Sequence, residues 1–424
     1  MDERILSYID EHREEMIGTL TGLIASPSPD LGGTKAQDLV EQYLLGMGFE
    51  TEVFQGIGEG VRDLPDFCDP GVSYPADTWN LVGYKRSGSE QPSLLLFAHI
   101  DTEAADAWGK TGLDPFSPIR EDGRIYGLGA ADNKGGVAMM LEAVRTALHF
   151  RPELGYDLTV LSILGKHGGA FGTLTAMNRG CTADRTLYIH PAETGHGFQE
   201  IKNISLGVLD LKLTVRGEPG ILHDDLSPGV NANLRLNRFL TWLEEYNCDM
   251  RRKFRFDFGS FRGEPSYLLN VGSVHSDAGC GGIPQTAECL LRVRFFHPLT
   301  LTQTEEDLRR FLIGKARDAG LEDTWDLTAC GMRAQPAMIP EGHPFIQLTK
   351  RCIDEICGPQ EFIHQYHGGS DVRFPILYGN SVCVGIGPAC VLPEKGSGQM
   401  EWISEEDYLN GIRILTGILL SCVG

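Results

Sequence analysis

The stretch LLLFAHIDTEAADAW, Leu94–Trp108, decides the fold of this chain. Its apolar run, residues 93–98, has the length of one strand and ends at His99, and Asp101 follows two residues later. Such a run is typical of a buried strand, and open α/β sheets bind their ligands at the carboxyl ends of these strands. Because side chains i and i+2 of an extended segment point to the same face, Asp101 could hold the His99 ring by a hydrogen bond.

A glycine-rich turn forms the second part of the candidate site. The segment GRIYGLGAADNKGG, Gly123–Gly136, delivers Asp132, Asn133 and Lys134 to the start of a helical pattern. Its glycines supply the positive φ angles that a tight strand-to-helix turn needs. We expect the Asp132 carboxylate to be a partner for a metal ion held by His99.

The bulk composition excludes several classes of protein. The chain has 424 residues, more than one ordinary core accommodates, so we expect two domains. Its 42% hydrophobic content and mean hydropathy of -0.15 are typical of a soluble globular protein. The sequence has neither a signal peptide nor an apolar run of about 18 residues, so we expect a cytoplasmic protein. The formal net charge of -21 disfavours binding to nucleic acid or to an anionic membrane.

The cysteines predict neither disulfides nor a zinc knuckle. There are 11 of them, scattered along the chain and without a CxxC pair. An odd, unpaired set of this kind is typical of reduced cysteines that pack as small apolar side chains.

Strands and helices alternate through the first half of the chain. Apolar spacing predicts helices over residues 2–25, 35–47, 136–150 and 173–179, and strands over 49–54, 80–86, 93–99, 157–164 and 185–190. This alternation predicts an α/β fold, a doubly wound and mostly parallel sheet with helices on both faces.

The pattern changes from about residue 207. Two segments, 207–217 and 286–296, alternate as half-exposed strands do, and a helical pattern over 231–246 lies between them. The doubly wound pattern resumes near Pro340 and ends in a helix over 404–420. We therefore expect residues 1–206 and 331–424 to form one domain and residues 207–330 to form an inserted α+β sandwich.

The two motifs around His99 and Asp132, with Trp108 and the intervening DPFSP, resemble a known enzyme family. It is the co-catalytic zinc family of aminoacylases, acetylornithine and succinyl-diaminopimelate deacylases, and glutamate-releasing carboxypeptidases. The resemblance covers nearly the whole chain. It implies a zinc-peptidase-like fold with an inserted lid, a dimer formed through that lid, zinc ligation by His99 and Asp132, and Asp132 as the bridge between two ions.

The chain departs from the family at several site positions. Where the family has Asp-Glu-Glu, with a general base followed by a zinc ligand, this sequence has Gly165, Lys166 and His167. Where the family has an acidic ligand before a proline, this chain has His190. The position of the family's last histidine ligand falls at Ser397.

These exchanges favour one metal ion over two. Two divalent ions about 3.5 to 4 Å apart repel each other by roughly 17 to 19 kcal/mol at an effective dielectric constant of 20. Here Asp132 is the one carboxylate left among the implied ligands, and Lys166 adds a cation. We expect a single ion, zinc or another first-row divalent metal, held from the set His99, Asp132, His167 and His190. The alternative is that these histidines only form hydrogen bonds and no metal binds.

Three interpretations of Lys166 stay open. A metal and burial could depress its pKa, so that it serves as a neutral base. It could instead stay charged, occupy the place of the second ion and stabilise an oxyanion. It could also be the remnant of a lost activity.

The resemblance also implies residues that bind substrate. His223 matches the lid histidine that polarises the scissile carbonyl, commonly in the neighbouring subunit. The other candidates for substrate contact are Asn231, Arg294, Gly369, Asp371, Arg373 and Ser397. The backbone amides of the segment HGGSDVRF, which holds three of these residues, could bind an anion.

The sequence therefore predicts a metal-dependent, hydrolase-like enzyme that acts on an amide bond of a small N-acyl amino acid or peptide. Asp101, Lys166 and His223 are its candidate catalytic residues. Two alternatives remain, a family member that carries out acyl transfer, amide formation or a lyase step, and an inactive binding protein.

Overall fold

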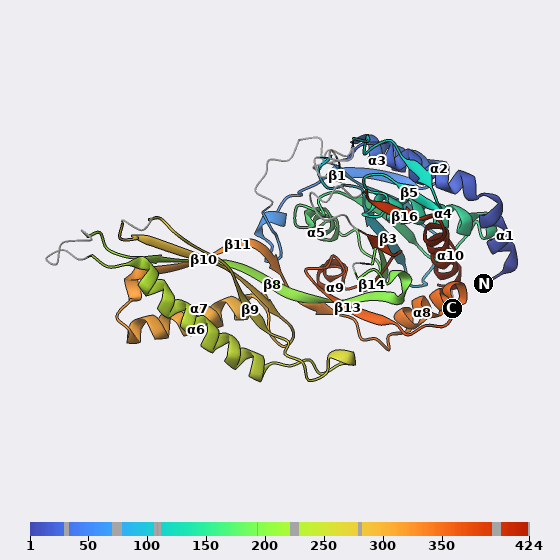
Figure 1. The fold of residues 1–424 in the computed structure, drawn as a ribbon. Coiled ribbons are helices and arrows are strands. Elements are labelled where there is room, and N and C mark those ends of the chain that lie inside the picture. The colour runs from blue at the N-terminus through green and yellow to red at the C-terminus, as the bar shows by residue number, and fades with distance from the viewer. Residues whose placement is uncertain are drawn as a thin grey trace. The chain divides into compact units, whose positions relative to one another are not determined.

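In the computed structural model, the described residues are 1–28, 34–69, 79–105, 108, 112–192, 194–220, 229–278, 282–391 and 400–422. They form two compact units (Figure 1). Unit 1 comprises residues 1–204, 338–366 and 371–424, and unit 2 comprises residues 205–337 and 367–370. The main segment of unit 2 thus spans residues 205–337. The sequence predicts a slightly shorter insertion, over residues 207–330.

Unit 1 is built on one mixed sheet whose centre is parallel. The strands lie in the order β1 (Glu50–Gln55), β2 (Trp79–Lys85), β6 (Leu158–Ile163), β3 (Leu94–His99), β7 (Arg185–Ile189), β14 (Val382–Ile386) and β8 (Glu200–Arg216). The pairs from β6 to β14 are parallel, and the outer pairs are antiparallel. This arrangement confirms the predicted doubly wound α/β fold.

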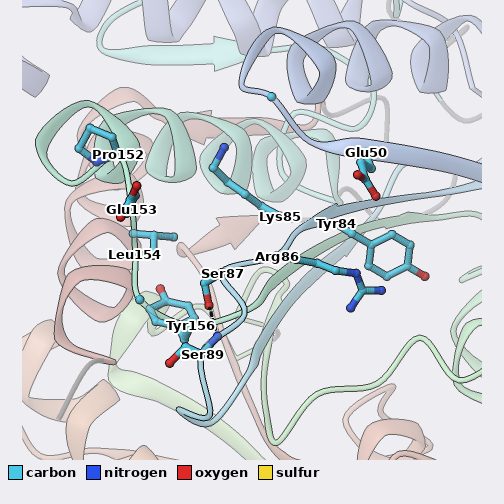
Figure 2. A pocket seen from close by; sticks show the side chains of 12 residues that line it. Glu50, Tyr84, Lys85, Arg86, Ser87, Ser89, Pro152, Glu153, Leu154 and Tyr156 are labelled. Carbon is cyan, nitrogen blue, oxygen red and sulfur yellow. Dashed lines mark hydrogen bonds between the residues drawn. The ribbon is translucent and has the colours of Figure 1, made fainter.

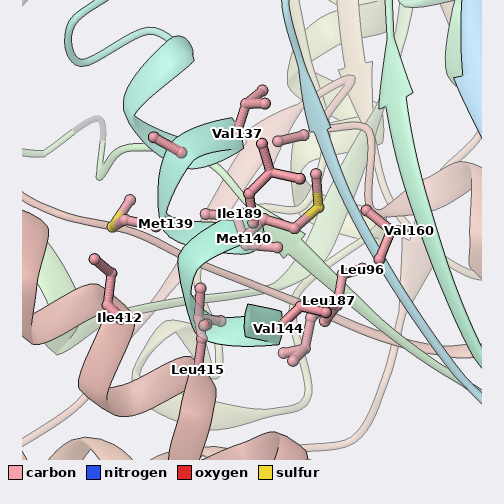
Figure 3. Packing of buried hydrophobic residues seen from close by; sticks show 14 of the residues in the cluster. Leu96, Val137, Met139, Met140, Val144, Val160, Leu187, Ile189, Ile412 and Leu415 are labelled. Atoms are coloured by element: carbon pink, nitrogen blue, oxygen red, sulfur yellow. The ribbon is translucent and has the colours of Figure 1, made fainter. Parts of the chain in front are cut away.

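Helices cover both faces of this sheet. They are α1 (Glu3–Glu11), α2 (Arg13–Ile24), α3 (Thr34–Gly46), α4 (Lys134–Phe150), α5 (Phe171–Asn178), α8 (Pro344–Cys357), α9 (Arg373–Tyr378) and α10 (Glu405–Ser421). Leu94 and Leu96 of β3 pack into a core with α4 and α10, whereas Leu95 and Phe97 pack into a second core with α5. Figure 3 shows Leu96 in the first core, with Val144 of α4 and Leu415 of α10. Alternate residues of β3 are therefore buried on opposite faces, which explains its unbroken apolar run.

Two details of unit 1 differ from the prediction. The helix predicted over residues 2–25 is broken at His12, whose ring nitrogen Nδ1 lies 2.8 Å from the carbonyl oxygen of Tyr8. A second, small sheet was not predicted, and its strands are β15 (Cys390–Val391), β16 (Trp402–Ser404), β5 (Arg124–Tyr126) and β4 (Ile119–Glu121).

Unit 2 is an antiparallel sheet with two long helices. The later part of β8 lies between β11 (Trp325–Ala334) and β10 (Thr286–Phe295), and β9 (Leu268–Ser276) forms the edge beyond β10. Side chains of α6 (Ala232–Lys253) and α7 (Leu301–Asp318) share a core with these strands. The short strands β12 (Ala337–Met338) and β13 (Ile363–Gly368) also pair with β8. None of the described helices is both long and apolar enough to cross a membrane.

Candidate metal centre

Three predicted ligands meet at the carboxyl ends of neighbouring parallel strands. His99 is the last residue of β3, His190 directly follows β7, and Asp132 lies in the turn before α4. The Oδ1 atom of Asp132 lies 2.9 Å from Nε2 of His99 and 3.5 Å from Nε2 of His190. Ligand atoms of these three residues all lie within 4.8 Å of one another.

The backbone of Asp101 orients the His99 ring. The Nδ1 atom of His99 lies 3.1 Å from the main-chain carbonyl oxygen of Asp101 and 3.5 Å from its carboxylate. A carbonyl oxygen only accepts, so Nδ1–H donates to it and Nε2 faces Asp132. Burial alone would lower the pKa of His99, but the Asp132 charge and the hydrogen bonds to both carboxylates raise it to about 10. The buried Asp132 has a pKa well below its usual value, chiefly because His99 opposes the effect of burial.

Glu401, which the sequence motifs did not single out, holds the Asp132 turn in place. Its buried carboxylate accepts the backbone N–H groups of Gly129, Ala131 and Asp132 at 2.9, 2.8 and 2.8 Å. Burial raises the pKa of Glu401 to about 7, against the opposing effect of these hydrogen bonds. The three bonds fix the backbone that carries the Asp132 ligand.

Lys166 is paired with a buried carboxylate. Its Nζ atom lies 2.7 Å from Oδ1 of Asp371, which is fully buried, and the other carboxylate oxygen accepts the Thr173 hydroxyl at 2.9 Å. An ion pair of this kind favours the charged form of lysine. Of the three interpretations of Lys166, the contacts therefore favour the fixed cation.

His167 belongs to a second group of potential ligands. Ligand atoms of His167, His99 and Asp101 lie within 4.8 Å of one another. The His167 ring packs edge-to-face on the His99 ring at 5.5 Å between centroids. Its Nδ1 atom also lies 3.5 Å from a carboxylate oxygen of Glu103. Burial lowers the pKa of His167, but Glu103, Asp101 and Asp132 outweigh it, so the net pKa is raised. The structure therefore does not gather the four predicted ligands into one group, because His167 is separate from His190.

Lys202 was not predicted and lies behind His190. Its buried Nζ atom lies 2.8 Å from Nδ1 of His190 and 2.6 Å from the carbonyl oxygen of Pro191. Burial and the Lys202 charge lower the pKa of His190 well below its usual value.

Several predicted substrate-binding residues have structural partners instead. Arg373 is completely buried, and its guanidinium lies 3.5 Å from a carboxylate oxygen of Asp66. The Asp371 carboxylate accepts hydrogen bonds from the Lys166 ammonium and the Thr173 hydroxyl. Both side chains thus have protein partners in unit 1, and their contact with a substrate stays a prediction.

Within unit 2, Asn231 caps α6, since its side-chain oxygen accepts the N–H of Asn233 at 2.9 Å. The N–H of Gly369 donates to the carbonyl oxygen of Leu206 at 3.2 Å, and anion binding by the amides of this segment stays a prediction. Arg294 is exposed on β10. His223 and Ser397 lie outside the described residues, and their roles stay predictions.

A separate pocket of about 510 Å³ lies at the other end of the unit 1 strands (Figure 2). Residues at the end of β2 and just before β6 line this pocket. It lies at the edge of the sheet opposite the carboxyl ends that carry His99 and His190. Some of its polar groups bond to the protein, since Ser87 donates to Asp157 and Lys85 donates to the carbonyl of Met47. The groups of potential metal ligands among the described residues lie at the carboxyl ends instead.

Comparison with known proteins identifies the family. The model of peptidase family M20/M25/M40 matches residues 95–421. The chain belongs to this family. The M20 assignment confirms the resemblance deduced from the His99 and Asp132 motifs.

Individual relatives agree with the M20 assignment. Succinyl-diaminopimelate desuccinylase of Methylobacterium radiotolerans is 31% identical over 367 residues, 83% of this chain and 84% of that protein. N-formyl-4-amino-5-aminomethyl-2-methylpyrimidine deformylase of Bacillus subtilis is 32% identical over 193 residues, 43% of this chain and 41% of that protein.

Solved structures share the fold. A tripeptidase from Staphylococcus aureus matches with a TM-score of 0.70 at 16% identity, over 97% of this chain and 98% of that chain. Human carnosine dipeptidase 1 matches with a TM-score of 0.67 at 17% identity, over 99% of this chain and 98% of that chain. At such low identity the likeness shows the fold alone.

The residues His99, Asp132 and His190 fit a metal ion of the kind that M20 peptidases use. Two imidazole nitrogens and one carboxylate oxygen converge, which is a zinc-like combination that leaves a position for substrate. The His99 ring offers Nε2 while its Nδ1–H is bonded, as metal-bound histidines do.

Proposed function

We propose that this chain is a metal-dependent amide hydrolase with one zinc or other first-row divalent ion at His99, Asp132 and His190. Its proposed substrates are small N-acyl amino acids or peptides. The M20 membership supports this proposal, as do relatives named for desuccinylation and deformylation.

The ion pair between Lys166 and Asp371 carries the proposal of a single ion. Lys166 occupies the sequence position of the family's general base, and Asp371 holds its ammonium group in place. A second divalent ion beside this fixed cation would be repelled, and no carboxylate at 166 or 167 offsets the repulsion. In this proposal the single ion and the charged lysine take the place of the two ions that the family resemblance implies.

The protein groups have distinct proposed roles. A bound metal ion would supply Lewis acidity, which polarises a carbonyl group or lowers the pKa of water. Asp101 orients His99 through its carbonyl, and Glu401 fixes the turn that carries Asp132. The Lys166 ammonium stabilises negative charge that develops on the substrate oxygen. His223 is the proposed second group that polarises the substrate carbonyl.

The same ion pair supports a second candidate function. A lysine held in its charged form does not accept a proton, so the position of the family's general base lacks a base. Acyl transfer, amide formation or a lyase step would not require activated water at this position. We therefore keep non-hydrolytic chemistry on a related substrate as the alternative, and an inactive binding protein as the third possibility.

We also propose a homodimer through unit 2. Strand β9 forms the edge of the described sheet, and its Val271 and Val274 side chains are 37% and 53% exposed. An edge strand with exposed apolar side chains is a surface on which a second copy can pair.

Metal content and turnover together test the proposed function. The chain, purified without added metal, should contain about one equivalent of ion, and Asp132→Asn should remove it. Hydrolysis of N-succinyl-diaminopimelate, an N-formyl aminopyrimidine and dipeptides should depend on that ion. Two equivalents would reject the single-ion proposal. One equivalent with acyl transfer to an added amine, and without hydrolysis, would favour the alternative.

A further inference from the structure

The pocket of about 510 Å³ at the edge of unit 1 has the size of a site for a small molecule (Figure 2). Its walls come from the end of β2 and from the loop between α4 and β6. The groups of potential metal ligands lie at the opposite ends of the central strands, so this pocket is separate from them.

Lys85 is a partly buried cation in this pocket. Its Nζ atom donates to the carbonyl oxygen of Met47 at 3.1 Å and lies 5.6 Å from the centroid of the Phe49 ring. Within the part of the chain that the structure describes, no carboxylate oxygen lies within 4.0 Å of this ammonium group. An ammonium group has three donors, so two of them are available to an anion in the pocket.

The loop between α4 and β6 adds backbone donors. Among the described residues, no acceptor receives the N–H groups of Glu153, Leu154 or Gly155. Gly155 has a φ of 82°, and turns of this kind can direct successive N–H groups to one side, where they bind an anion. Backbone donors without a protein partner bind water or a ligand. Lys85 and this loop thus supply the donors of a carboxylate site.

Two carboxylates in the same pocket distinguish between classes of ligand. Glu50 and Glu153 are exposed, and neither has a cationic partner among the described residues. They would repel a simple anion such as phosphate and would attract an ammonium group. Together with Lys85 and Arg86, the lining side chains carry two positive and two negative charges. A ligand that carries both charges therefore fits better than a ligand that carries either charge alone.

We propose that this pocket binds a free α-amino acid. The ligand carboxylate accepts hydrogen bonds from Lys85 and from the N–H groups of residues 153–155, and the ligand ammonium group pairs with Glu50 or Glu153. Hydrolysis of the proposed substrates would release ligands of this class, but binding here requires neither a metal ion nor turnover. Because three of the four charged side chains are exposed and exposed ion pairs are weak, we expect a dissociation constant of roughly 1 mM or more.

The test follows the binding of L-alanine to the full, metal-free chain by amide NMR. We expect saturable shifts of the N–H signals of Gly48 and of residues 153–155, which line the pocket. Propionate lacks the ammonium group and ethylamine lacks the carboxylate. Each should therefore bind about two- to fivefold more weakly than L-alanine, as expected for the loss of one partly exposed ion pair.

Variants test each charge of the pocket. Lys85→Gln keeps a hydrogen-bond donor but loses the charge, so L-alanine should bind about two- to fivefold more weakly, whereas Lys85→Arg should bind as the wild type does. The double variant Glu50→Gln/Glu153→Gln, at two exposed positions, should weaken binding of L-alanine but not of propionate. Lys212→Gln in unit 2, where the lysine is 41% exposed, is the matched control and should change nothing.

His99→Ala separates this pocket from the proposed metal centre, because it should leave the shifts of residues 153–155 unchanged. Shifts confined to the turn around Asp132, or the absence of saturable shifts, would overturn the inference. Equal affinity of L-alanine for wild type, Lys85→Gln and the double glutamine variant would overturn it as well. If L-alanine binds at the pocket but the chain holds no metal and hydrolyses no amide, the pocket stands and the proposed function fails.

Discussion

The Nζ atom of Lys166 lies 2.7 Å from Oδ1 of Asp371, 205 residues further along the chain. The carboxylate is fully buried, and the lysine side chain is 18% exposed. The family resemblance puts Lys166 at the sequence position of the general base, so we propose that Asp371 fixes a cation where other family members place a proton acceptor. We therefore expect the pair to affect both stability and the number of bound metal ions.

Asp371→Asn should leave the Lys166 charge without its partner. Because removing one member of a buried pair leaves an uncompensated charge, we expect a loss of roughly 2–4 kcal/mol in the free energy of unfolding. Urea unfolding followed by circular dichroism measures it. Asp10→Asn, which removes the partner of Arg413 at the exposed surface, should cost less than about 1 kcal/mol. Equal losses in the two variants would contradict the importance of the buried pair.

Restoring glutamate at positions 166 and 167 should raise metal occupancy only when Asp371 is neutralised. Lys166→Glu by itself would place two carboxylates together, which is unfavourable in a buried site. We expect Lys166→Glu/His167→Glu/Asp371→Asn to contain more metal per chain than wild type, and the variant that keeps Asp371 to contain less than the triple variant. Elemental analysis of the purified chains measures this. Equal occupancy with and without Asp371 would show that this residue does not limit the second ion.

Glu401→Gln should loosen the turn that carries Asp132. The amide can no longer accept all three backbone N–H groups, so we expect a loss of about 1–3 kcal/mol in stability and roughly 10–100-fold in zinc affinity. Isothermal titration with zinc and thermal unfolding measure the two effects. Glu406→Gln, five residues further on in the first turn of α10 and with a side chain 63% exposed, is the matched control and should change neither.

The fold was largely predictable because its central strands are buried on both faces. The residues of β3, β6 and β7 form apolar runs that need no partner to be recognised. In contrast, β5 and β16 have three residues each and form by pairing with other short strands, including each other across the chain. Runs of that length carry no periodicity, so the small sheet was missed.

The candidate site was predictable in its ligands but not in its lysines. The motifs gave His99 and Asp132, and the structure places them 2.9 Å apart. Lys202 and Lys212 lie on the same strand, yet the first is buried and the second is 41% exposed. No local pattern separates them, because the burial of Lys202 depends on Gly385, far away in sequence.

His364 should make the stability of unit 1 depend on pH. Its Nδ1 atom lies 2.8 Å from Oδ1 of Asn203, and its Nε2 atom lies 2.8 Å from Nζ of Lys350 and 3.6 Å from a carboxylate oxygen of Glu341. Burial and the Lys350 charge lower the pKa of His364 to about 4, against Glu341. The folded-state pKa lies below the unfolded value near 6.5, so this stabilisation is present above pH 6.5 and is lost as the pH falls towards 4.

We expect the wild type to lose roughly 1–2 kcal/mol more than His364→Asn between pH 7 and pH 4.5 in urea unfolding. Lys350→Met should also reduce the pH dependence, because it removes the positive charge beside the ring. Identical pH profiles of wild type and His364→Asn would show that this histidine does not contribute.

Val274→Glu should dissociate the proposed dimer. The side chain is exposed on the edge strand β9, and symmetry would bring the two introduced carboxylates near each other at a shared edge. We expect a dimer in the wild type and at least about tenfold weaker association in the variant, since one buried like-charge contact costs more than 1.4 kcal/mol. Analytical ultracentrifugation over a range of concentrations measures this association. Leu234→Glu, where the leucine is 71% exposed, adds the same charge on α6 and not on the edge strand, and it should leave the dimer intact. A wild type that sediments as a monomer, or a dimer that Leu234→Glu disrupts and Val274→Glu does not, would place the interface elsewhere.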